Sequence, residues 1–223
     1  MLSSLPPATE TGLEALTRLH DVASLCARAA CPVQQCLGEV LQAAVDIARA
    51  DAGLLQITDH AACDWHQPLR VGLDETGAAR LALPDMPERS LLMATLAQGS
   101  RVVVQDGAVQ TAAATPQGAA VSVDDAWRQA VREAGFPAWI ATPLTSSTGA
   151  LVGVVTTWFR QPHHPTERDL RLSDLLVRQA SDYLARCGLQ RRLHESEERF
   201  RELASAMSGV VERTGGLSVS VPK

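Results

Sequence analysis

The chain has 223 residues with a formal net charge of −5, and 46% of its residues are hydrophobic. This length and composition fit one globular domain with an extension, and they exclude a disordered or fibrous protein. The single lysine is Lys223 and no basic block is present, so we do not expect a nucleic-acid-binding groove.

The sequence shows no sign of export or membrane insertion. No stretch reaches the ~18–20 uninterrupted apolar residues that a membrane helix needs. The first residues, MLSSLPPATETG, also lack the basic and apolar regions of a signal peptide. We therefore expect a cytoplasmic protein that does not bind membranes.

The cysteines match neither a zinc site nor a disulfide framework. The first three are spaced by five residues, which does not place them on one face of a helix. We interpret all of them as buried or incidental thiols. They are Cys26, Cys31, Cys36, Cys63 and Cys187.

Apolar periodicity predicts two helices followed by two strands in the first part of the chain. Residues 1–12 are rich in Pro, Ser and Thr and are expected to be disordered. Cys31-Pro32 should separate the helices, because proline disfavours helical geometry in the residue before it. Pro68 should confine the second strand to an edge of the sheet. The predicted elements are helices at 13–30 and 33–50 and strands at 54–58 and 64–72.

Two further helices are expected in the middle of the chain, each closed by a glycine. The helix at 85–98 should end at Gly99 and the helix at 124–134 at Gly135, since glycine adopts the left-handed conformation that commonly ends a helix.

Between these helices, RVVVQ at 101–105 predicts a short strand, and residues 107–123 show no clear periodicity. A compact domain seldom keeps such a segment structureless unless it covers a binding site or is disordered. A lid and an unstructured insertion both remain open for 107–123.

Residues 139–159 predict a hairpin of two strongly apolar strands around the Ser/Thr/Gly-rich turn at 145–149. Both faces of the second strand are apolar, so both must be covered and the hairpin should lie at the centre of a sheet. Strict alternation places Leu151, Val155 and Phe159 on one face and Val152, Val154 and Trp158 on the other.

A very long helix is predicted after the hairpin. Thr166 and Asp169 form a capping pattern, and Gly188 is the one helix-breaking residue up to Met207. At ~1.5 Å per residue, about forty residues reach on the order of 60 Å, which exceeds what packing on one domain requires. Up to about residue 187 its apolar face should pack on the sheet, through Leu172, Leu176 and Tyr183.

Beyond residue 187 the apolar residues follow the alternating four- and three-residue spacing of a coiled coil, with Ser196 inside the seam. This spacing predicts a homodimer through the helix, and residues 208–223 are expected to form a disordered tail. The predicted interface residues are Leu189, Leu193, Phe200, Leu203 and Met207.

The hairpin sequence, WIATPL followed by a small polar turn and LVGVVTTWF, resembles the closing strands of a GAF domain of the bacterial sensor histidine kinase type. ADAGLLQ at 50–56 and PHHPTERDLR at 162–171 agree with the same pattern in the same order. The resemblance covers most of residues 13–190. ESEERFR at 195–201 further resembles the opening helix of a PAS domain, although no PAS strands follow.

The resemblance implies an α+β fold, with a GAF-like antiparallel sheet of five or six strands, helices on both faces and a long C-terminal coiled-coil helix. The implied organisation is a disordered segment at 1–12, a GAF sensory domain at 13–187, a signalling helix at 188–207 and a tail at 208–223.

A ligand pocket of such a domain would lie on one face of the sheet, where the tryptophans either line a cavity or fill the core. His163-His164 lies between two prolines and, without further ligands of fitting spacing, is expected at the surface rather than on a metal or haem. The candidate pocket residues are Trp65, Val104, Asp106, Trp127, Trp139, Ala141 and Trp158.

The resemblance implies a non-catalytic sensory domain that binds a small molecule, or senses a redox or light cue, and signals through a dimeric helix to an output such as a histidine kinase. No cofactor can be assigned from the sequence. Two alternatives remain open: a small GAF-fold thiol enzyme such as a free methionine sulfoxide reductase, and a purely structural dimerisation module.

Overall fold

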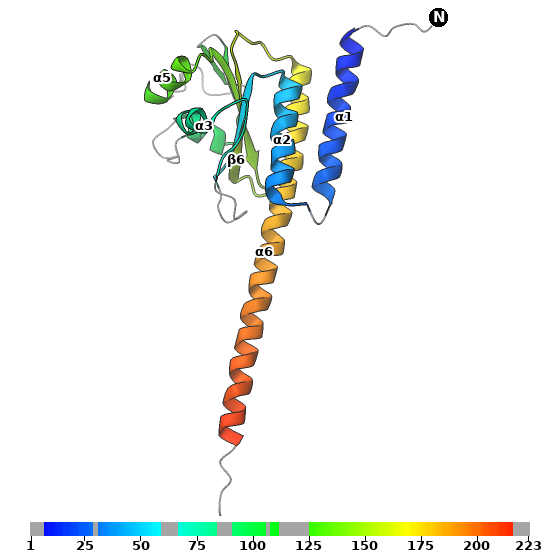
Figure 1. Cartoon of the computed structure of the whole chain (residues 1–223), viewed down its shortest axis with the longest axis vertical. Helices are drawn as coiled ribbons and strands as arrows, with labels where there is room; N and C mark the ends of the chain where they lie inside the picture. Colours follow the sequence, from blue (N-terminus) through cyan, green and yellow to red (C-terminus); the bar gives the residue numbers. More distant parts are fainter. Residues whose placement is uncertain are drawn as a thin grey trace, which may run out of the picture.

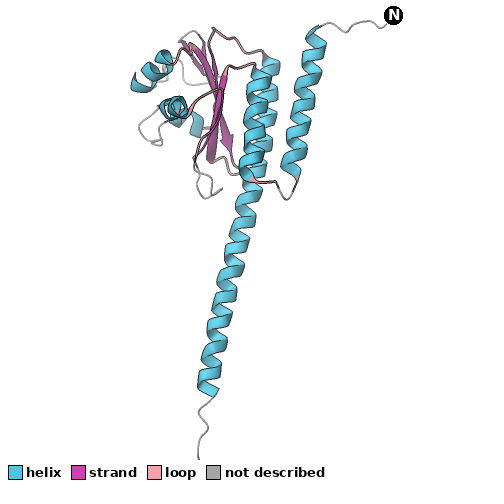
Figure 2. Cartoon of the chain, viewed as in Figure 1, coloured by secondary structure: helices cyan, strands magenta, loops and turns pink. Residues whose placement is uncertain are grey.

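One sheet and two layers of helices make up the described part of the chain (Figure 1, Figure 2). The computed structural model describes residues 7–28, 31–58, 67–83, 91–105, 108–111 and 125–215. The helices are α1 Pro7–Ala27, α2 Val33–Ala48, α3 Glu75–Leu81, α4 Leu91–Ala97, α5 Asp125–Glu133 and α6 Glu167–Gly215. The strands are β1 Ala52–Ile57, β2 Leu69–Val71, β3 Val102–Gln105, β4 Ala108–Thr111, β5 Ala138–Thr145 and β6 Leu151–Phe159.

Helices cover both faces of the sheet, as the sequence predicts for an α+β fold. α2 and the first half of α6 pack side by side on one face, and α1 lies outside them (Figure 1). α3, α4 and α5 cover the opposite face. Beyond the sheet α6 continues as a long single helix. Within the described ranges, no helix combines the length and the apolarity needed to cross a bilayer.

The six strands form one antiparallel sheet in the order β2-β1-β6-β5-β3-β4. The β5–β6 hairpin lies at its centre, which confirms the prediction made from its apolar faces. β2 lies at the edge, directly after Pro68, and is shorter than the predicted strand. Residues 59–66, which include the predicted turn and the start of that strand, lie outside the described residues.

Two apolar clusters separate on either side of the hairpin. Leu37 and Leu41 of α2, Leu176 and Leu184 of α6, and Val155 of β6 belong to the cluster between the sheet and the long helices. The cluster on the opposite face joins the sheet to α3, α4 and α5, and its members include Leu54, Leu81, Leu92, Trp139 and Trp158. The period-2 pattern of β6 thus anchors a core on both faces.

A bulge in β6 changes the face taken by its first residues. The register shifts between Leu144 and Thr145, whose partners are Gly153 and Leu151, so Val152 is the extra residue. Val152 packs in the cluster under α2 and α6, whereas Leu151 contacts the cluster on the opposite face. The predicted alternation was wrong for these two residues, because it assumed an uninterrupted pleat.

Local signals fix the ends of three helices, as predicted. Gly99 and Gly135 adopt left-handed φ angles of 76° and 77° just beyond α4 and α5. At the start of α6 the backbone N–H of Asp169 donates to Oγ1 of Thr166 at 3.2 Å, and the backbone N–H of Thr166 donates to Oδ2 of Asp169 at 3.1 Å. This reciprocal pair satisfies backbone donors that the first turn leaves free.

The ends of the outer helices differ from the predictions. α1 begins at Pro7, so residues 7–12 belong to a helix rather than to a disordered lead. Proline suits the first turn of a helix, where its missing N–H has no intrahelical partner. α6 continues to Gly215, so residues 208–215 are helical and not part of a disordered tail. Residues 1–6 and 216–223 lie outside the described residues.

Two short elements were missed by the sequence analysis. Asp74 caps α3, its Oδ1 accepting from the backbone N–H of Gly77 at 2.6 Å. Residues 108–111 form β4, which pairs with β3 along its whole length although the segment shows no apolar periodicity. Residue 107 and residues 112–123, the remainder of the predicted lid or insertion, lie outside the described residues.

We expect Gly153→Ala to reduce the free energy of unfolding by about 1–3 kcal/mol, because overpacking a close approach forces the backbone to shift. A Cβ at residue 153 would lie 2.7 Å from the backbone oxygen of Gln56 on β1. Urea unfolding of wild type and variant measures the loss. A variant as stable as wild type would contradict this contact between β1 and β6.

Gly38→Ala is the matched control for this substitution. Gly38 lies inside α2, and a Cβ there would meet no atom within 4 Å. The same chemical change should therefore raise the unfolding free energy by about 0.5–1 kcal/mol, since alanine favours a helix interior over glycine.

Candidate functional site

Three tryptophans lie together on the sheet face that α3, α4 and α5 cover. Trp139 of β5 and Trp158 of β6 are direct cross-strand partners. Trp127 of α5 meets Trp139 edge to face, with ring centroids 5.1 Å apart and planes at 87°. The Trp127 indole Nε1 donates to the backbone oxygen of Leu81 at 3.1 Å, which ties α5 to α3.

The structure brings most of the predicted pocket residues into this one cluster. Val104 of β3 and Ala141 of β5 join the tryptophans there. Trp65 and Asp106 lie outside the described residues. All five described side chains are buried, so this part of the face is a packed apolar core.

One polar atom in the tryptophan cluster has no partner among the described residues. The Nε1 of Trp158 is buried without a hydrogen-bond acceptor, and the residue is 0% exposed. A buried N–H without an acceptor is costly, so such groups usually bond to a protein atom, a water or a ligand. Among the described residues, the cluster therefore contains one buried indole N–H that is free to donate to a water or a ligand.

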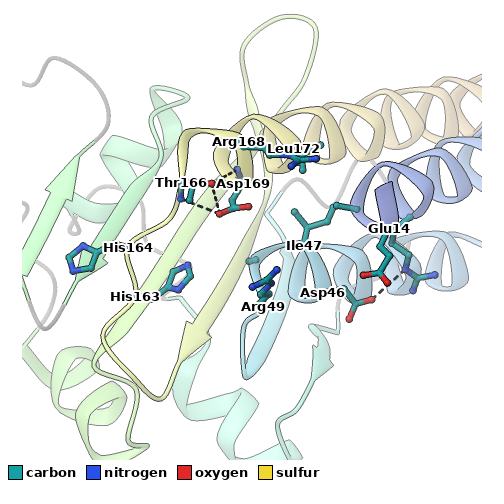
Figure 3. Close-up of a pocket in the computed structure, with 13 residues that line it drawn as sticks. Glu14, Asp46, Ile47, Arg49, His163, His164, Thr166, Arg168, Asp169 and Leu172 are labelled. Atoms are coloured by element: carbon teal, nitrogen blue, oxygen red, sulfur yellow. Dashed lines mark hydrogen bonds and ion pairs between the residues drawn. The ribbon is translucent and has the colours of Figure 1, made fainter. Parts of the chain in front are cut away.

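A separate groove of about 640 Å³ lies on the helical side, between α1, the end of α2 and the start of α6 (Figure 3). Its walls carry charges of both signs, so the groove has no clear preference for an anion or a cation. Arg18 is held by Glu39 at 3.1 Å and by Asp46 at 3.4 Å. The groove was not predicted, because its residues come from segments more than a hundred positions apart.

His163 closes one end of this groove from the loop before α6. Its ring stacks on Phe159 with centroids 3.9 Å apart and planes at 5°. Burial lowers the pKa of His163, although the nearby Asp169 carboxylate opposes the shift and His164 adds to it. His163 is thus half-buried rather than at the surface, whereas His164 is exposed and the two rings stand apart (Figure 3).

No group of three or more His, Cys, Asp and Glu side chains in the described ranges is arranged to hold a metal ion. The groove offers ion pairs and one half-buried imidazole.

Lowering the pH from about 7 to 5 should destabilise the protein partly through His163. In the unfolded chain the His163 imidazole has a pKa of ~6.5, whereas in the folded protein its pKa is lower. Below about pH 6.5 the unfolded chain therefore binds more protons than the folded protein, and the free energy of unfolding falls. His163→Gln should make the unfolding free energy less steeply dependent on pH. His164→Gln, at the exposed neighbouring position, should keep the wild-type dependence; equal slopes for wild type and His163→Gln would contradict this account.

The described seam residues of α6 are exposed to solvent. Leu189, Leu193, Phe200 and Leu203 are 62%, 62%, 76% and 64% exposed. The side chain of Met207 lies outside the described residues. An apolar row on an otherwise charged helix is typical of a surface that pairs with another helix.

The GAF domain family model matches residues 32–185. The fold is similar to the GAF domain of an Acinetobacter phosphoenolpyruvate-protein phosphotransferase, with a TM-score of 0.56 and 12% identity over 80% of this chain and 98% of that chain. It is also similar to the GAF domain of a protein described as a sensor histidine kinase from Pseudomonas syringae pv. tomato, with a TM-score of 0.55 and 15% identity over 85% and 97%.

A third similar structure is the phycocyanobilin-bound GAF domain of a cyanobacterial phytochrome, with a TM-score of 0.57 and 12% identity over 79% of this chain and 96% of that chain. No curated protein matches the chain. At these identities the structural matches establish the fold alone. Because the family match spans more than half of the chain, the protein belongs to the GAF domain family.

Proposed function

We propose that this protein is a regulatory GAF module of a bacterial signal-transduction system, without catalysis of its own. A small molecule, or a redox or light cue, changes the packing of the domain, and α6 carries the change to an output such as a histidine kinase. The module is proposed to act in the cytoplasm. The similarity of residues 195–201 to a PAS opening helix fits a further signalling domain on that side.

The observation that carries this proposal is the continuity of α6. Its first half is part of the domain core, with Leu172, Leu176 and Leu184 buried. The same helix then extends without a break to Gly215. A shift of the part of α6 that packs in the domain must therefore also move the part that extends beyond it. A signalling helix requires this property.

A buried arginine couples the sheet to α6. Arg101, 9% exposed at the start of β3, pairs with the carboxylate of Asp174 on α6. Its Nη2 also donates to the backbone oxygen of Leu170 at 3.4 Å, and its Nε donates to Oγ1 of Thr142 at 3.2 Å. Arg101 directly precedes the strand that carries Val104 of the tryptophan cluster, so this contact offers a route from the candidate ligand face to the helix.

The seam of α6 faces away from the domain core. Leu193 follows Leu184 by nine residues, which is about 900° of helical rotation, or about 180° after whole turns. Leu175, 48% exposed, lies two coiled-coil repeats of seven residues before Leu189 and on the same side. A second α6 can therefore pair along this side while each domain lies outside the pair. We propose a parallel homodimer, because parallel pairing places two output domains together.

Two alternatives remain to be tested. A thiol enzyme would need reactive cysteines near the pocket, but Cys26 and Cys36 belong to the cluster under α2 and α6, on the opposite side of the sheet from the tryptophans. Cys63 lies outside the described residues, so loss of turnover in a Cys63→Ser variant would support the enzyme. A purely structural module would bind no ligand.

Native mass spectrometry and an absorbance spectrum of the purified protein distinguish a sensor from a structural module. A retained small molecule or chromophore supports a sensor. If that molecule binds at the tryptophan cluster, it should quench the tryptophan fluorescence of the wild type. The quenching should be lost in a Trp139→Phe variant that still folds. A protein that binds no molecule across a metabolite and chromophore panel favours the structural module.

We expect Phe200→Glu to convert the dimer to a monomer. Two glutamates facing each other in the seam lose hydration without gaining a partner, at a cost on the order of a few kcal/mol. Each 1.4 kcal/mol raises the dissociation constant about tenfold. Sedimentation velocity measures the change, and the melting transition of the domain should be retained because Phe200 is 76% exposed and far from the core.

Arg201→Gln is the matched control, since it also lowers the charge by one but lies beside the seam. It should remain dimeric. If Phe200→Glu remains dimeric too, the dimer forms elsewhere, for example through the exposed Leu13 and Leu16 on α1.

A further inference from the structure

Four cysteines from distant parts of the sequence gather where the α1–α2 connection meets α6. Cys26 lies in the last turn of α1, Cys36 in the first turn of α2 and Cys31 in the connection between them. Cys187 lies on α6 and lines the same groove as Cys26 and Cys31. All four are free thiols.

Two of these thiols are in direct contact. The Sγ atoms of Cys26 and Cys36 lie 2.8 Å apart, against ~2.0 Å in a disulfide bond. The two side chains are 2% and 0% exposed. Since they belong to the ends of two consecutive helices, a small movement of either side chain suffices to bring the sulfurs into bonding distance.

The surroundings assign different roles to the two sulfurs. The hydrogen bond from Cys36 lowers the pKa of Cys26; burial opposes this shift and the positive charge of Arg186 adds to it. The same hydrogen bond, together with burial, raises the pKa of Cys36. Cys26 is therefore the sulfur that ionises more readily, and Cys36 is the one that keeps its proton.

A groove of about 400 Å³ leads to Cys26 from solvent. Cys31, Tyr183, Arg186 and Cys187 line it together with Cys26. It is wide enough for a small oxidant, whereas the low exposure of Cys26 excludes bulky reagents. Arg186, at its wall, donates from Nη2 to the backbone oxygen of Cys26 at 2.6 Å.

We propose that Cys26 and Cys36 form a redox-active dithiol that hydrogen peroxide or a small hydroperoxide oxidises to a disulfide. The Cys26 thiolate attacks one peroxide oxygen, the O–O bond breaks, and hydroxide leaves with sulfenic acid formed on Cys26. The Cys36 sulfur then attacks the Cys26 sulfur and expels its hydroxyl, which leaves as water with the Cys36 proton. Two thiols and one hydrogen peroxide thus give one disulfide and two waters.

The new bond would join α1 to α2 beside the helix that carries the signal. Arg186 of α6 holds the Cys26 backbone, and the hydroxyl of Tyr183, also on α6, donates to the backbone oxygen of Cys31 at 2.8 Å. Oxidation therefore changes the two helix ends that contact α6 as it leaves the domain. The thiol chemistry stands independently, whereas its role as a signal rests on the proposed function.

The test treats the full-length reduced protein with stoichiometric hydrogen peroxide under native conditions, followed by alkylation and tryptic mass mapping. We expect the loss of two hydrogens and of two alkylatable thiols, reversed by a dithiol reductant. The cross-link should join peptide 19–28, which contains Cys26, to peptide 29–49. Because 29–49 contains both Cys31 and Cys36, fragmentation of the cross-linked wild-type peptide identifies the bonded residue without any variant.

Variants provide the matched comparison. Cys26→Ser and Cys36→Ser should lose the cross-link, while Cys31→Ser should keep it. A cross-link to Cys31 or to peptide 187–191, stable oxygen adducts on Cys26 without a cross-link, or thiols that do not react would each overturn the proposal. These measurements do not depend on dimerisation or signalling. The dithiol proposal can therefore be wrong while the proposed function is correct, and the proposed function can be wrong while the dithiol proposal is correct.

Discussion

The β5–β6 hairpin is the constraint on which the rest of the structure depends. Its strands are buried on both sides, with Val155 and Trp158 of β6 in opposite clusters. A sheet with two apolar faces cannot leave either face in water, so the chain must supply two helical layers. The long helices cover one face and the short helices cover the other. The two faces therefore differ, since one packs on the long helix α6 and the other on three short helices around the tryptophan cluster.

The same division explains how a change on one face can reach the other. Close packing resists gradual deformation, so a rearrangement of the tryptophan cluster must be taken up by the strands that carry it. Arg101 extends this connection, because it directly precedes β3 and pairs with Asp174 on α6. The buried Arg101 guanidinium is held by this ion pair and by hydrogen bonds to Leu170 of α6 and Thr142 of β5, so the strand and the helix are expected to move together.

The parts of the fold that the sequence predicted are those with local causes. Gly99, Gly135 and the Thr166–Asp169 pair end or begin helices through contacts within a few residues, and the hairpin follows from its own apolar pattern. β4 could not be found in this way, because an edge strand needs only backbone pairing with β3. The bulge at Val152 depends on register across two strands, which alternation along one strand does not reveal. The cap of α3 at Asp74, by contrast, was a local signal available in the sequence.

The candidate sites show the same limit. The sequence grouped Trp127, Trp139 and Trp158 as candidate pocket residues, and the hairpin places two of them directly opposite each other. The contact between Cys26 and Cys36 was not predicted, because five-residue spacing was judged along one helix. The chain reverses between the two residues, so a separation of ten positions becomes a contact between the facing ends of α1 and α2. The sequence spacing of two cysteines therefore argues against a contact only when both lie on the same helix or strand. Cys26 and Cys36 lie on different helices, so their spacing did not exclude the contact.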